Sequence, residues 1–434
     1  MYFPKLKAET QQRLAVAEFG GLERRPGGGA GYPAEMENLW SGGYPALETR
    51  PQRSVAALLT APHGIVGKDG LFWVDGTGLY ANGIKTGLVL TEGDKQLVGM
   101  GAYLLVFPDK KYINTQKLTE YGSMENVRTG TGTATFTLCD ETGRALGSYS
   151  VGTEAPAEAA AGELWLDTGR AVSVMRQYDG SAWEEMAGVC TKIAAAGIGM
   201  GFAAGDGVTV SCTGVRRGAG RTVAVADGVV YYLGNDGVYA FDGSMPVCVS
   251  RTLGENRYVG GSGGGESGRY WLSALDAAGN AELLVYDTRR KMWHRQDGTE
   301  AVGFARRNGS MMVLCRDGRL LDTGGDVGQK EGAFAWSAES GELGLYTPEH
   351  KYLARLELRL RPETGAEVKA YIQYDGSGVW EQAGSVTGAA GQIRGAVLHL
   401  RPRRCGQLRL KLAGTGGCRV YSAAAVYEKG SDGP

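Results

Sequence analysis

The chain has 434 residues, enough for about two to four domains with a sizeable buried core. Glycine contributes 71 residues but proline only 13, and no Gly-X-Y period runs through the sequence, so a collagen-like or disordered chain is excluded. The 46 Lys and Arg balance the 47 Asp and Glu, and this net charge of −1 excludes a protein that packs nucleic acid over its whole surface.

Residues 1–55 form the first predicted element, an extended N-terminal arm. This segment has too much Gly and Pro for a domain core, yet too many large apolar residues for a free linker. We expect it to pack on a partner, which is either the rest of its own chain or, as an assembly arm, a neighbouring subunit. Short helical pieces are expected in the first 17 residues and near residues 155–161. The candidate subunit-interface residues are Phe19, Gly20, Gly21, Leu22, Met36, Asn38, Trp40, Tyr44, Pro45, Arg50 and Arg53.

Three segments anchored by Asp-Gly or Asn-Gly pairs predict β-hairpins. They are residues 68–81, 227–243 and 308–324, and each alternates turn residues with short runs of β-branched and aromatic residues. Asp-Gly and Asn-Gly adopt the positive φ angles that two-residue hairpin turns require. Gly228 and Gly309 are 81 residues apart, which is two units of about 40 residues, the period of a four-stranded propeller blade.

A second repeated pattern predicts the outer hairpin of a blade. Residues 104–113 and 283–293 share an apolar run, a polar turn and an aromatic strand. Gly70 and Gly228 are 158 residues apart, which is too far for two blades, so we expect an inserted domain between them. The predicted order is first propeller blades in residues 56–128, an inserted β domain in 129–220 and the remaining blades in 221–345.

Residues 346–434 predict a separate β-sandwich-like domain. Residues 355–361 alternate between polar and apolar side chains, which is typical of a strand with one buried face. Strands are expected at residues 352–361, 368–374, 396–401, 408–412 and 420–427. The predicted fold class is therefore all-β: a β-propeller with an inserted β domain and a C-terminal β-sandwich-like domain.

The last module is more basic than the rest of the chain. Residues 351–434 contain 13 Lys and Arg against 7 Asp and Glu. Such an excess meets either phosphates or an acidic neighbouring subunit. We favour the protein neighbour, because no aromatic residues alternate with the basic ones to stack on bases. The basic cluster consists of Arg401, Arg403, Arg404 and Arg409.

The sequence carries no pattern that is typical of catalysis or metal binding. Its four histidines and seven widely spaced cysteines form no His-Glu-x-x-His or Cys-x-x-Cys motif, and no Gly-x-Ser-x-Gly elbow leads from a strand to a helix. We therefore expect no enzyme, no cofactor and no metal site. The start of the chain lacks the apolar run of a secretory signal, and no stretch reaches the roughly 20 apolar residues of a membrane span. Synthesis in the cytoplasm and no membrane partner are expected.

The arm carries a resemblance to a known family. Its motifs are Phe19-Gly20-Gly21-Leu22, then Glu35-Met36-Glu37-Asn38-Leu39, then Tyr44-Pro45-x-Leu47-x-x-Arg50-Pro51-x-Arg53, followed by Tyr112-Ile113-Asn114-Thr115 in the first blades. This pattern resembles the packaged-DNA stabilisation or tail nozzle proteins of tailed bacteriophages, especially short-tailed phages. The likeness is good over the arm and the first blade and looser over the general plan.

The resemblance implies a structural virion protein without catalytic residues. Such proteins form rings, usually hexameric, below the head-to-tail connector, where they extend the DNA channel and help retain the packaged DNA. The implied partners are further copies of the chain, the adaptor or connector, distal tail proteins, and double-stranded DNA that passes without sequence specificity. The implied location is the virion tail, assembled in the host cytoplasm.

Two other readings of the sequence stay open. One is a glycan-binding or glycan-cleaving β-propeller, in which Trp73, Trp183 or Trp380 would line a sugar site. This alternative predicts a stable monomer and saturable glycan binding. The other is a Kelch-like interaction scaffold, which would bind a different protein without forming a ring.

Overall fold

The computed structural model describes residues 11–124, 135–169, 174–194, 215–216, 218–254, 257–266, 268–345, 349–388, 391–401 and 403–429. Strands account for 55% of the structure and helices for 2%, so the predicted all-β class is confirmed. In the described ranges the helices are two single 3-10 turns, η1 (Gly220–Thr222) and η2 (Arg251–Leu253). Contacts divide the chain into two compact units, Asn126–Val210 and the remainder.

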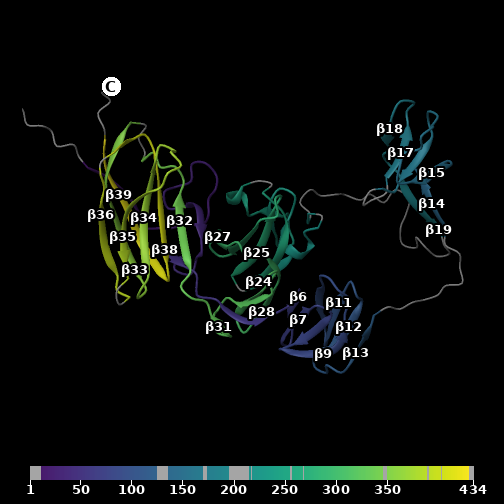
Figure 1. Cartoon of the computed structure of the whole chain (residues 1–434), viewed down its shortest axis with the longest axis horizontal. Coiled ribbons are helices and arrows are strands. Elements are labelled where there is room, and N and C mark those ends of the chain that lie inside the picture. The colour runs from purple at the N-terminus through teal and green to yellow at the C-terminus, as the bar shows by residue number, and fades with distance from the viewer. Residues whose placement is uncertain are drawn as a thin grey trace, which may run out of the picture. The chain divides into compact units, whose positions relative to one another are not determined.

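Five small antiparallel sheets are the main building blocks of the larger unit (Figure 1). The first sheet contains β6 (Pro62–Gly67), β7 (Leu71–Asp75), β8 (Gly78–Ala81) and β9 (Ile84–Val89). The second contains β10 (Gln96–Met100), β11 (Tyr103–Phe107), β12 (Lys111–Asn114) and β13 (Tyr121–Ser123). The third contains β20 (Ala224–Ala226), β21 (Val229–Leu233), β22 (Val238–Phe241) and β23 (Val247–Cys248). The fourth contains β24 (Tyr258–Glu266), β25 (Arg269–Asp276), β26 (Ala281–Asp287) and β27 (Met292–Asp297).

The fifth sheet joins distant parts of the sequence. Its strands β28 (Ala301–Arg307), β29 (Ser310–Cys315) and β30 (Arg319–Asp322) are consecutive. The next strand in the sheet is β5 (Ser54–Leu58), which precedes the first sheet in the chain, and the last is β31 (Gln329–Lys330). A segment before the first sheet therefore completes the fifth one.

Turn chemistry explains the predicted hairpins, which are confirmed. Asp227 and Gly228 have φ angles of 50° and 79° between β20 and β21, and Asn308 and Gly309 have 50° and 81° between β28 and β29. Both central residues of a type I′ turn need positive φ, which Asp-Gly and Asn-Gly tolerate. These pairs thereby fix where each hairpin reverses.

Hydrophobic clusters connect neighbouring sheets in one continuous order, from second to first, fifth, fourth and third. Leu104 packs with Phe72, linking the second sheet to the first. The cluster around Trp73 and Met312 links the first sheet to the fifth, and the one around Trp271 links the fifth to the fourth. A larger cluster, which includes stacked Tyr231 and Tyr270, then links the fourth sheet to the third. The five sheets thus form a series in which each packs on the next.

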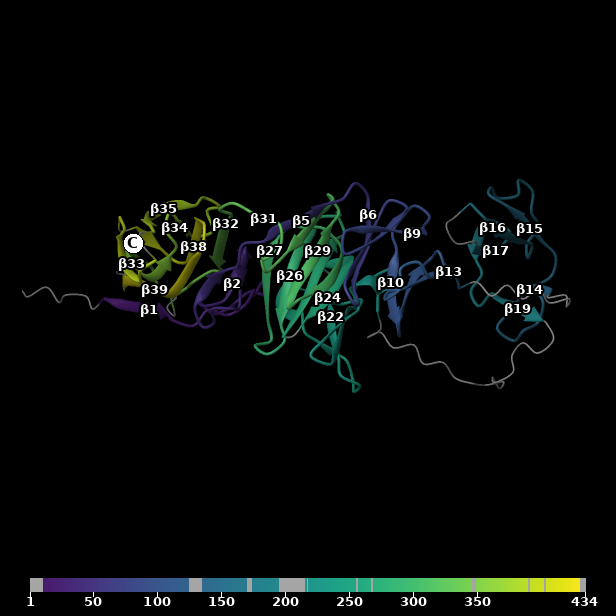
Figure 2. The same cartoon turned by 90° about the horizontal axis from the view of Figure 1, so that it is seen from below.

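Two further sheets form a sandwich that the arm completes. One sheet, named here the β33 sheet, contains β33 (Lys351–Pro362), β36 (Arg394–His399), β37 (Arg404–Cys405), β39 (Cys418–Lys429) and the arm strands β1 (Gln12–Val16), β3 (Leu39–Trp40) and β4 (Leu47–Thr49). The other, the β34 sheet, contains β34 (Glu367–Tyr374), β35 (Glu381–Thr387), β38 (Leu408–Thr415), β32 (Ala335–Ser340) and the arm strand β2 (Pro33–Glu37). Figure 2 shows β1 beside β39 and β2 near β38. The strand positions predicted after residue 346 are confirmed, and β35 and β37 were not predicted.

The smaller unit has its own sheets. Strands β14 (Thr135–Cys139) and β19 (Cys190–Ala194) pair with each other, and β15 (Tyr149–Gly152), β16 (Leu164–Asp167), β17 (Val174–Tyr178) and β18 (Trp183–Glu185) form a four-stranded sheet. Trp183 packs against Trp165 and Tyr178 with ring centroids 5.6 and 5.3 Å away. The sequence predicted an inserted domain over residues 129–220, and the smaller unit spans Asn126–Val210.

Two local predictions are wrong. Residues 12–16 form β1 rather than a helix, because their side chains alternate between half-buried and exposed positions along the edge of β39. Residues 155–161 contain no helix. The two apolar repeats also differ in place: residues 104–113 lie on the second and third strands of their sheet, whereas residues 283–293 lie on the third and fourth. Only the second repeat therefore spans the last two strands of its sheet.

Candidate functional site

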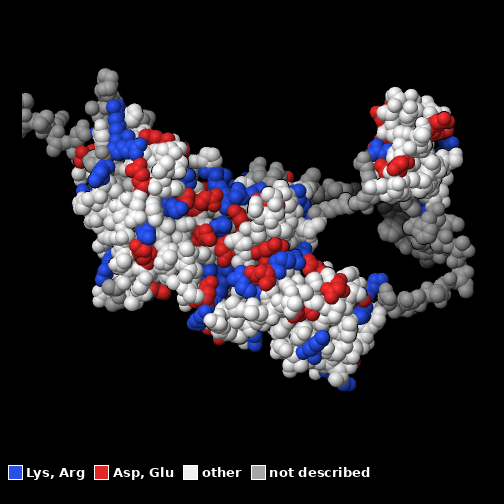
Figure 3. Space-filling view, in the orientation of Figure 1, with Lys and Arg blue, Asp and Glu red and all other residues white. Residues whose placement is uncertain are grey.

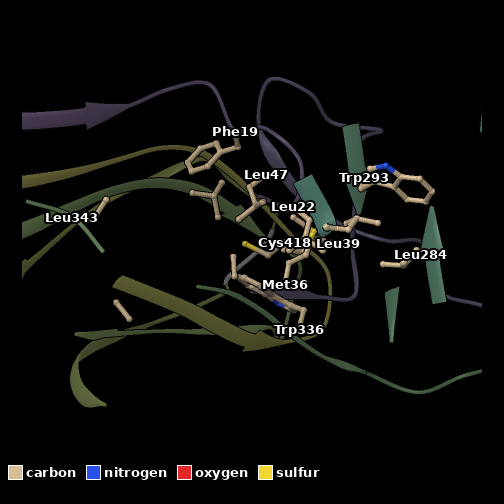
Figure 4. Close-up of a cluster of buried hydrophobic side chains, with 14 of the residues drawn as sticks. Phe19, Leu22, Met36, Leu39, Leu47, Leu284, Trp293, Trp336, Leu343 and Cys418 are labelled. Carbon is tan, nitrogen blue, oxygen red and sulfur yellow. The ribbon is translucent and has the colours of Figure 1, made fainter. Parts of the chain in front are cut away.

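The N-terminal arm is buried in its own chain. Phe19 exposes 9% of its surface, and Leu22 and Met36 expose 1% each. Figure 4 shows Leu22 between Trp336 of the sandwich and Trp293 of the fourth sheet. The arm therefore fills the space between these two parts of the larger unit, and the intrachain alternative accounts for its apolar residues.

Hydrogen bonds attach the arm to β27 on one side and to β32 on the other. The Leu22 amide donates to the Trp293 carbonyl at 2.7 Å, and the Asn38 amide donates to the Gln296 carbonyl at 2.5 Å. The Asn38 side chain donates to the Ala335 carbonyl at 2.7 Å. Its φ of 55° is one that Asn adopts more readily than most residues. Asn38 is thus a direct link between the fourth sheet and the sandwich.

The two glycines of the arm motif allow this close approach. A Cβ atom on Gly21 would lie 2.6 Å from the Trp293 carbonyl oxygen, and one on Gly20 would lie 2.1 Å from the Tyr32 ring. Both distances are far below van der Waals contact. The sequence Phe-Gly-Gly-Leu therefore suits a segment pressed against β27, with its two apolar residues in the core.

The two arginines of the arm motif are buried in ion pairs. Arg50 donates to the Asn38 side chain at 2.7 Å and pairs with Glu331. Arg53 pairs with Asp297 at 2.7 Å, with 4% of its side chain exposed. Burial lowers the pKa of Arg53, and the Asp297 carboxylate opposes that shift. Burial also acts to raise the pKa of Asp297, but Arg53 and two hydrogen bonds from Thr299 hold it below its ordinary range. These arginines stabilise the contact of the arm with β27 and with the loop after β31, and they do not face a partner subunit.

The remaining arm candidates lie nearer the surface. Pro45 is exposed, and Tyr44 and Trp40 are half-buried. The Tyr44 hydroxyl donates to Glu18, which raises the pKa of the tyrosine, and the Trp40 indole donates to Glu48 at 3.2 Å. Of the eleven candidates, this group alone keeps surface for a neighbouring subunit.

The basic cluster is partly neutralised by its own domain. Arg403 pairs with Glu381 at 2.6 Å, and Arg409 pairs with Glu339 at 3.4 Å. The exposed members are Arg401, Arg403 and Arg404, and Arg409 is half-buried. Figure 3 shows acidic and basic side chains intermingled over the visible face of the larger unit rather than one continuous basic surface. The cluster keeps a local positive character of limited strength.

Sequence reasoning missed a charged centre at Asp94, in the loop between β9 and β10. Its carboxylate lies 2.9 Å from Arg221, 3.2 Å from Arg316 and 3.2 Å from His63. Burial acts to raise the pKa of Asp94, but hydrogen bonds from Arg316 and His63 and the charge of Arg221 lower it overall. These partners come from the first sheet, the fifth sheet and the segment before the third. No local motif could reveal contacts over such separations.

The tryptophans proposed for a sugar site have different contacts. Trp73 is buried and stacks on Tyr80 at 5.9 Å. Trp183 lies in the aromatic cluster of the smaller unit. Trp380 faces the basic side chains of Arg409 and Lys411 on β38. Within the larger unit, Trp73 and Trp380 have different neighbours, and Trp183 belongs to the smaller unit.

Within the described ranges, no group of three or more His, Cys, Asp or Glu side chains is arranged to hold a metal ion. Burial raises the pKa of Cys315 to about 12 and that of Cys405 to about 11, so both thiols stay protonated at neutral pH. No helix among the described residues is long and apolar enough to cross a bilayer.

Comparison with known proteins identifies no family for this chain. No family model matches the chain, and no curated protein matches it in sequence. AztD of Citrobacter koseri is 12% identical over 84% of this chain and 97% of its own, with a TM-score of 0.25. An exo-β-1,3-galactanase of Phanerochaete chrysosporium is 7% identical over 86% of this chain and 100% of its own, with a TM-score of 0.20. A sialidase of Trypanosoma rangeli is 10% identical over 96% of this chain and 95% of its own, with a TM-score of 0.22. At these TM-scores the likeness carries no argument about fold or function.

Proposed function

We propose that this chain is a structural virion protein of a tailed bacteriophage, which forms a nozzle-like ring below the head-to-tail connector. The resemblance of the arm motifs is the starting point. The observation that carries the proposal is the place of those motifs: Gly21, Asn38, Arg50 and Arg53 all lie in one joint, with contacts to the fourth sheet, the sandwich or the loop after β31. A rigid joint between modules suits a building block of an assembly.

We further propose that the five sheets are the blades of a β-propeller. Their order of packing supports this, because it follows the chain except where β5 closes the fifth sheet. The remaining junction, between the second and third sheets, is a cleft lined by Asp94, Gln96, Phe107, Pro108, Lys110 and Arg221. The inserted unit leaves and re-enters the chain between these same two sheets. An insertion at that junction is compatible with a ring of blades.

The charge distribution is compatible with a channel for DNA. Tight binding of a duplex requires many unpaired Lys and Arg, and it would oppose passage of the DNA. The chain has a net charge of −1, and Glu381 and Glu339 pair with members of the basic cluster. We therefore propose contact with double-stranded DNA that is weak and independent of sequence, and a role without catalysis.

The test is the mass and shape of the purified full chain. Multi-angle light scattering over a range of concentrations is expected to give a species of several subunits, and negative-stain images should show rings. Among the described arm residues, Tyr32 is 47% exposed and Tyr44 is half-buried. The double variant Tyr32→Ser with Tyr44→Ser should reduce the mass toward one subunit without lowering the melting temperature.

A matched control uses aromatic residues outside the arm. Tyr121 is 44% exposed and Tyr149 38%. Their replacement by Ser should leave the ring intact. A monomer at every concentration, both alone and with a purified connector, would overturn the ring proposal. A ring that survives the arm variant would overturn the arm as its contact surface.

A further inference from the structure

A cavity of about 180 Å³ lies between the fourth and fifth sheets, under the arm. This is the space of roughly six water molecules. The arm supplies residues 40, 41, 50, 51 and 53, and the fifth sheet and its turns supply residues 309, 310, 323 and 324. The fourth sheet contributes the side chains that define its chemistry, which are Glu266, Arg269, Trp271, Val285, His294 and Gln296.

Strand pairing places three of these residues in one row. Trp271 is opposite Val285 on the neighbouring strand, and Val285 is opposite His294 on the next. Successive side chains of a strand point to opposite faces, so His294 faces away from the core that holds Trp293. The row gives the cavity an apolar wall that ends in an imidazole.

His294 is a polar side chain on the cavity wall without a hydrogen-bond partner among the described residues. It is 4% exposed, and no hydrogen bond joins its ring to any described residue. A buried polar group without a hydrogen bond normally costs free energy, and a ligand or water in the adjoining space removes that cost. An imidazole can both donate and accept, so it suits a group that does the same.

The cavity is electrically balanced. Each guanidinium on its wall has a carboxylate partner: Arg50 has Glu331, Arg53 has Asp297 and Arg269 has Glu266, the last pair at 3.6 Å. A net positive site for phosphate or sulfate is therefore not formed. Arg269 and Glu266 still offer further donors and acceptors beside the apolar row.

We propose that this cavity binds one neutral sugar ring. A sugar presents apolar C–H groups, which suit Trp271 and Val285, and hydroxyls, which donate and accept at once. The carboxylate of Glu266, the guanidinium of Arg269 and the imidazole of His294 match these hydroxyls. The site differs from one built on Trp73, Trp183 or Trp380, and it is independent of ring formation.

The test is saturation-transfer NMR followed by titration calorimetry on the full chain. The probes are the methyl glycosides of glucose, galactose, mannose and N-acetylglucosamine. At least one is expected to bind saturably in the millimolar range or tighter. His294→Leu should weaken that binding by about tenfold or more, equivalent to about 1.4 kcal/mol. The matched control is His399→Leu, because His399 is exposed on β36 of the sandwich.

A second variant guards against misfolding at His294. Arg269 is 27% exposed at its side chain, so Arg269→Met should fold and also weaken binding. Failure of every glycoside to bind the native chain would overturn the proposal. Binding that is unchanged in both variants, or saturable binding of inorganic phosphate instead, would do the same. None of these results depends on the mass of the assembly.

Discussion

Asp94 and Arg221 are 127 residues apart in the sequence, and their side chains form an ion pair of 2.9 Å. The inserted unit lies between them in the chain. Asp94 also accepts from Arg316 of the fifth sheet. One carboxylate therefore connects a segment before the insertion, a segment after it and a third part of the larger unit.

Replacement of Asp94 by Asn should destabilise the larger unit. The charge-assisted hydrogen bonds are partly exposed, so we expect a loss of about 1 kcal/mol in the free energy of unfolding. The pKa of Asp94 is lowered on folding from its ordinary 3.8. Its contribution is thus present above about pH 4 and is lost as the pH falls through the folded pKa. Urea titrations at pH 7 and pH 3 measure both effects.

The control is Asp317→Asn, because Asp317 pairs with Arg319 only two residues away. That variant should change stability by less than half as much at pH 7. Equal losses for the two variants would show that Asp94 has no special role in connecting the sheets.

The buried pair of Lys95 and Asp109 gives a second prediction. Their atoms are 2.8 Å apart, and the two side chains expose 0% and 1%. Lys95→Met leaves a buried carboxylate without its counter-ion, which should cost about 3 to 5 kcal/mol. The double variant with Asp109→Asn should recover most of this loss, because the amide still accepts from the Thr91 backbone. Guanidinium denaturation of the two variants measures the difference, and no recovery would contradict the pair as the cause.

Leu22 tests whether the arm is part of the core. Leu22→Ala should cost about 2 to 5 kcal/mol, because the side chain is 1% exposed and fills space between two modules. Leu14→Ala is the matched control: Leu14 is half-buried on β1 at the edge of the sandwich and should cost less. Thermal unfolding compares them. Equal stability of native chain and Leu22→Ala would mean that the arm lies elsewhere in solution.

His294 predicts a loss of stability in mild acid. Burial lowers its pKa from 6.5 to about 4, while Asp287 opposes and Arg269 and Arg290 support that shift. The pKa of His294 is lower in the folded chain than in the unfolded one. The free energy of unfolding is therefore not reduced by this group above about pH 6.5, and it declines as the pH falls toward 4. The total change should be about 3 kcal/mol. His294→Leu should remove this part of the pH dependence, measured by denaturation at pH 7 and pH 4.5; an unchanged slope would contradict it.

Much of the secondary structure could be predicted from local signals. Asp227-Gly228 and Asn308-Gly309 marked their turns because few other pairs adopt two positive φ angles. The alternation at residues 355–361 identified β33 for a similar local reason. The helix expected within the first 17 residues was wrong because residues 12–16 pair as a strand with β39, which lies far away in the sequence.

The candidate site depended on contacts that no local pattern contains. The burial of Leu22 follows from Trp293 and Trp336, which are hundreds of residues away in the sequence. The Asp94 centre and the His294 cavity arise in the same way, from side chains that meet only after the sheets pack. Sequence identified the arm as unusual, but its partner was a matter of tertiary structure.

The pairing of β1 with β39 has a consequence for how the chain is made. Residues 12–58 leave the ribosome before β30 and β39, yet β1 and β4 pair with β39, and β5 pairs with β30. The pairings with β30 and β39 cannot form until more than half of these 434 residues have been synthesised. Such long-range pairing slows folding and leaves strand edges open to wrong partners. Until β30 and β39 have been synthesised, the growing chain must keep β1 and β5 from pairing with other strands.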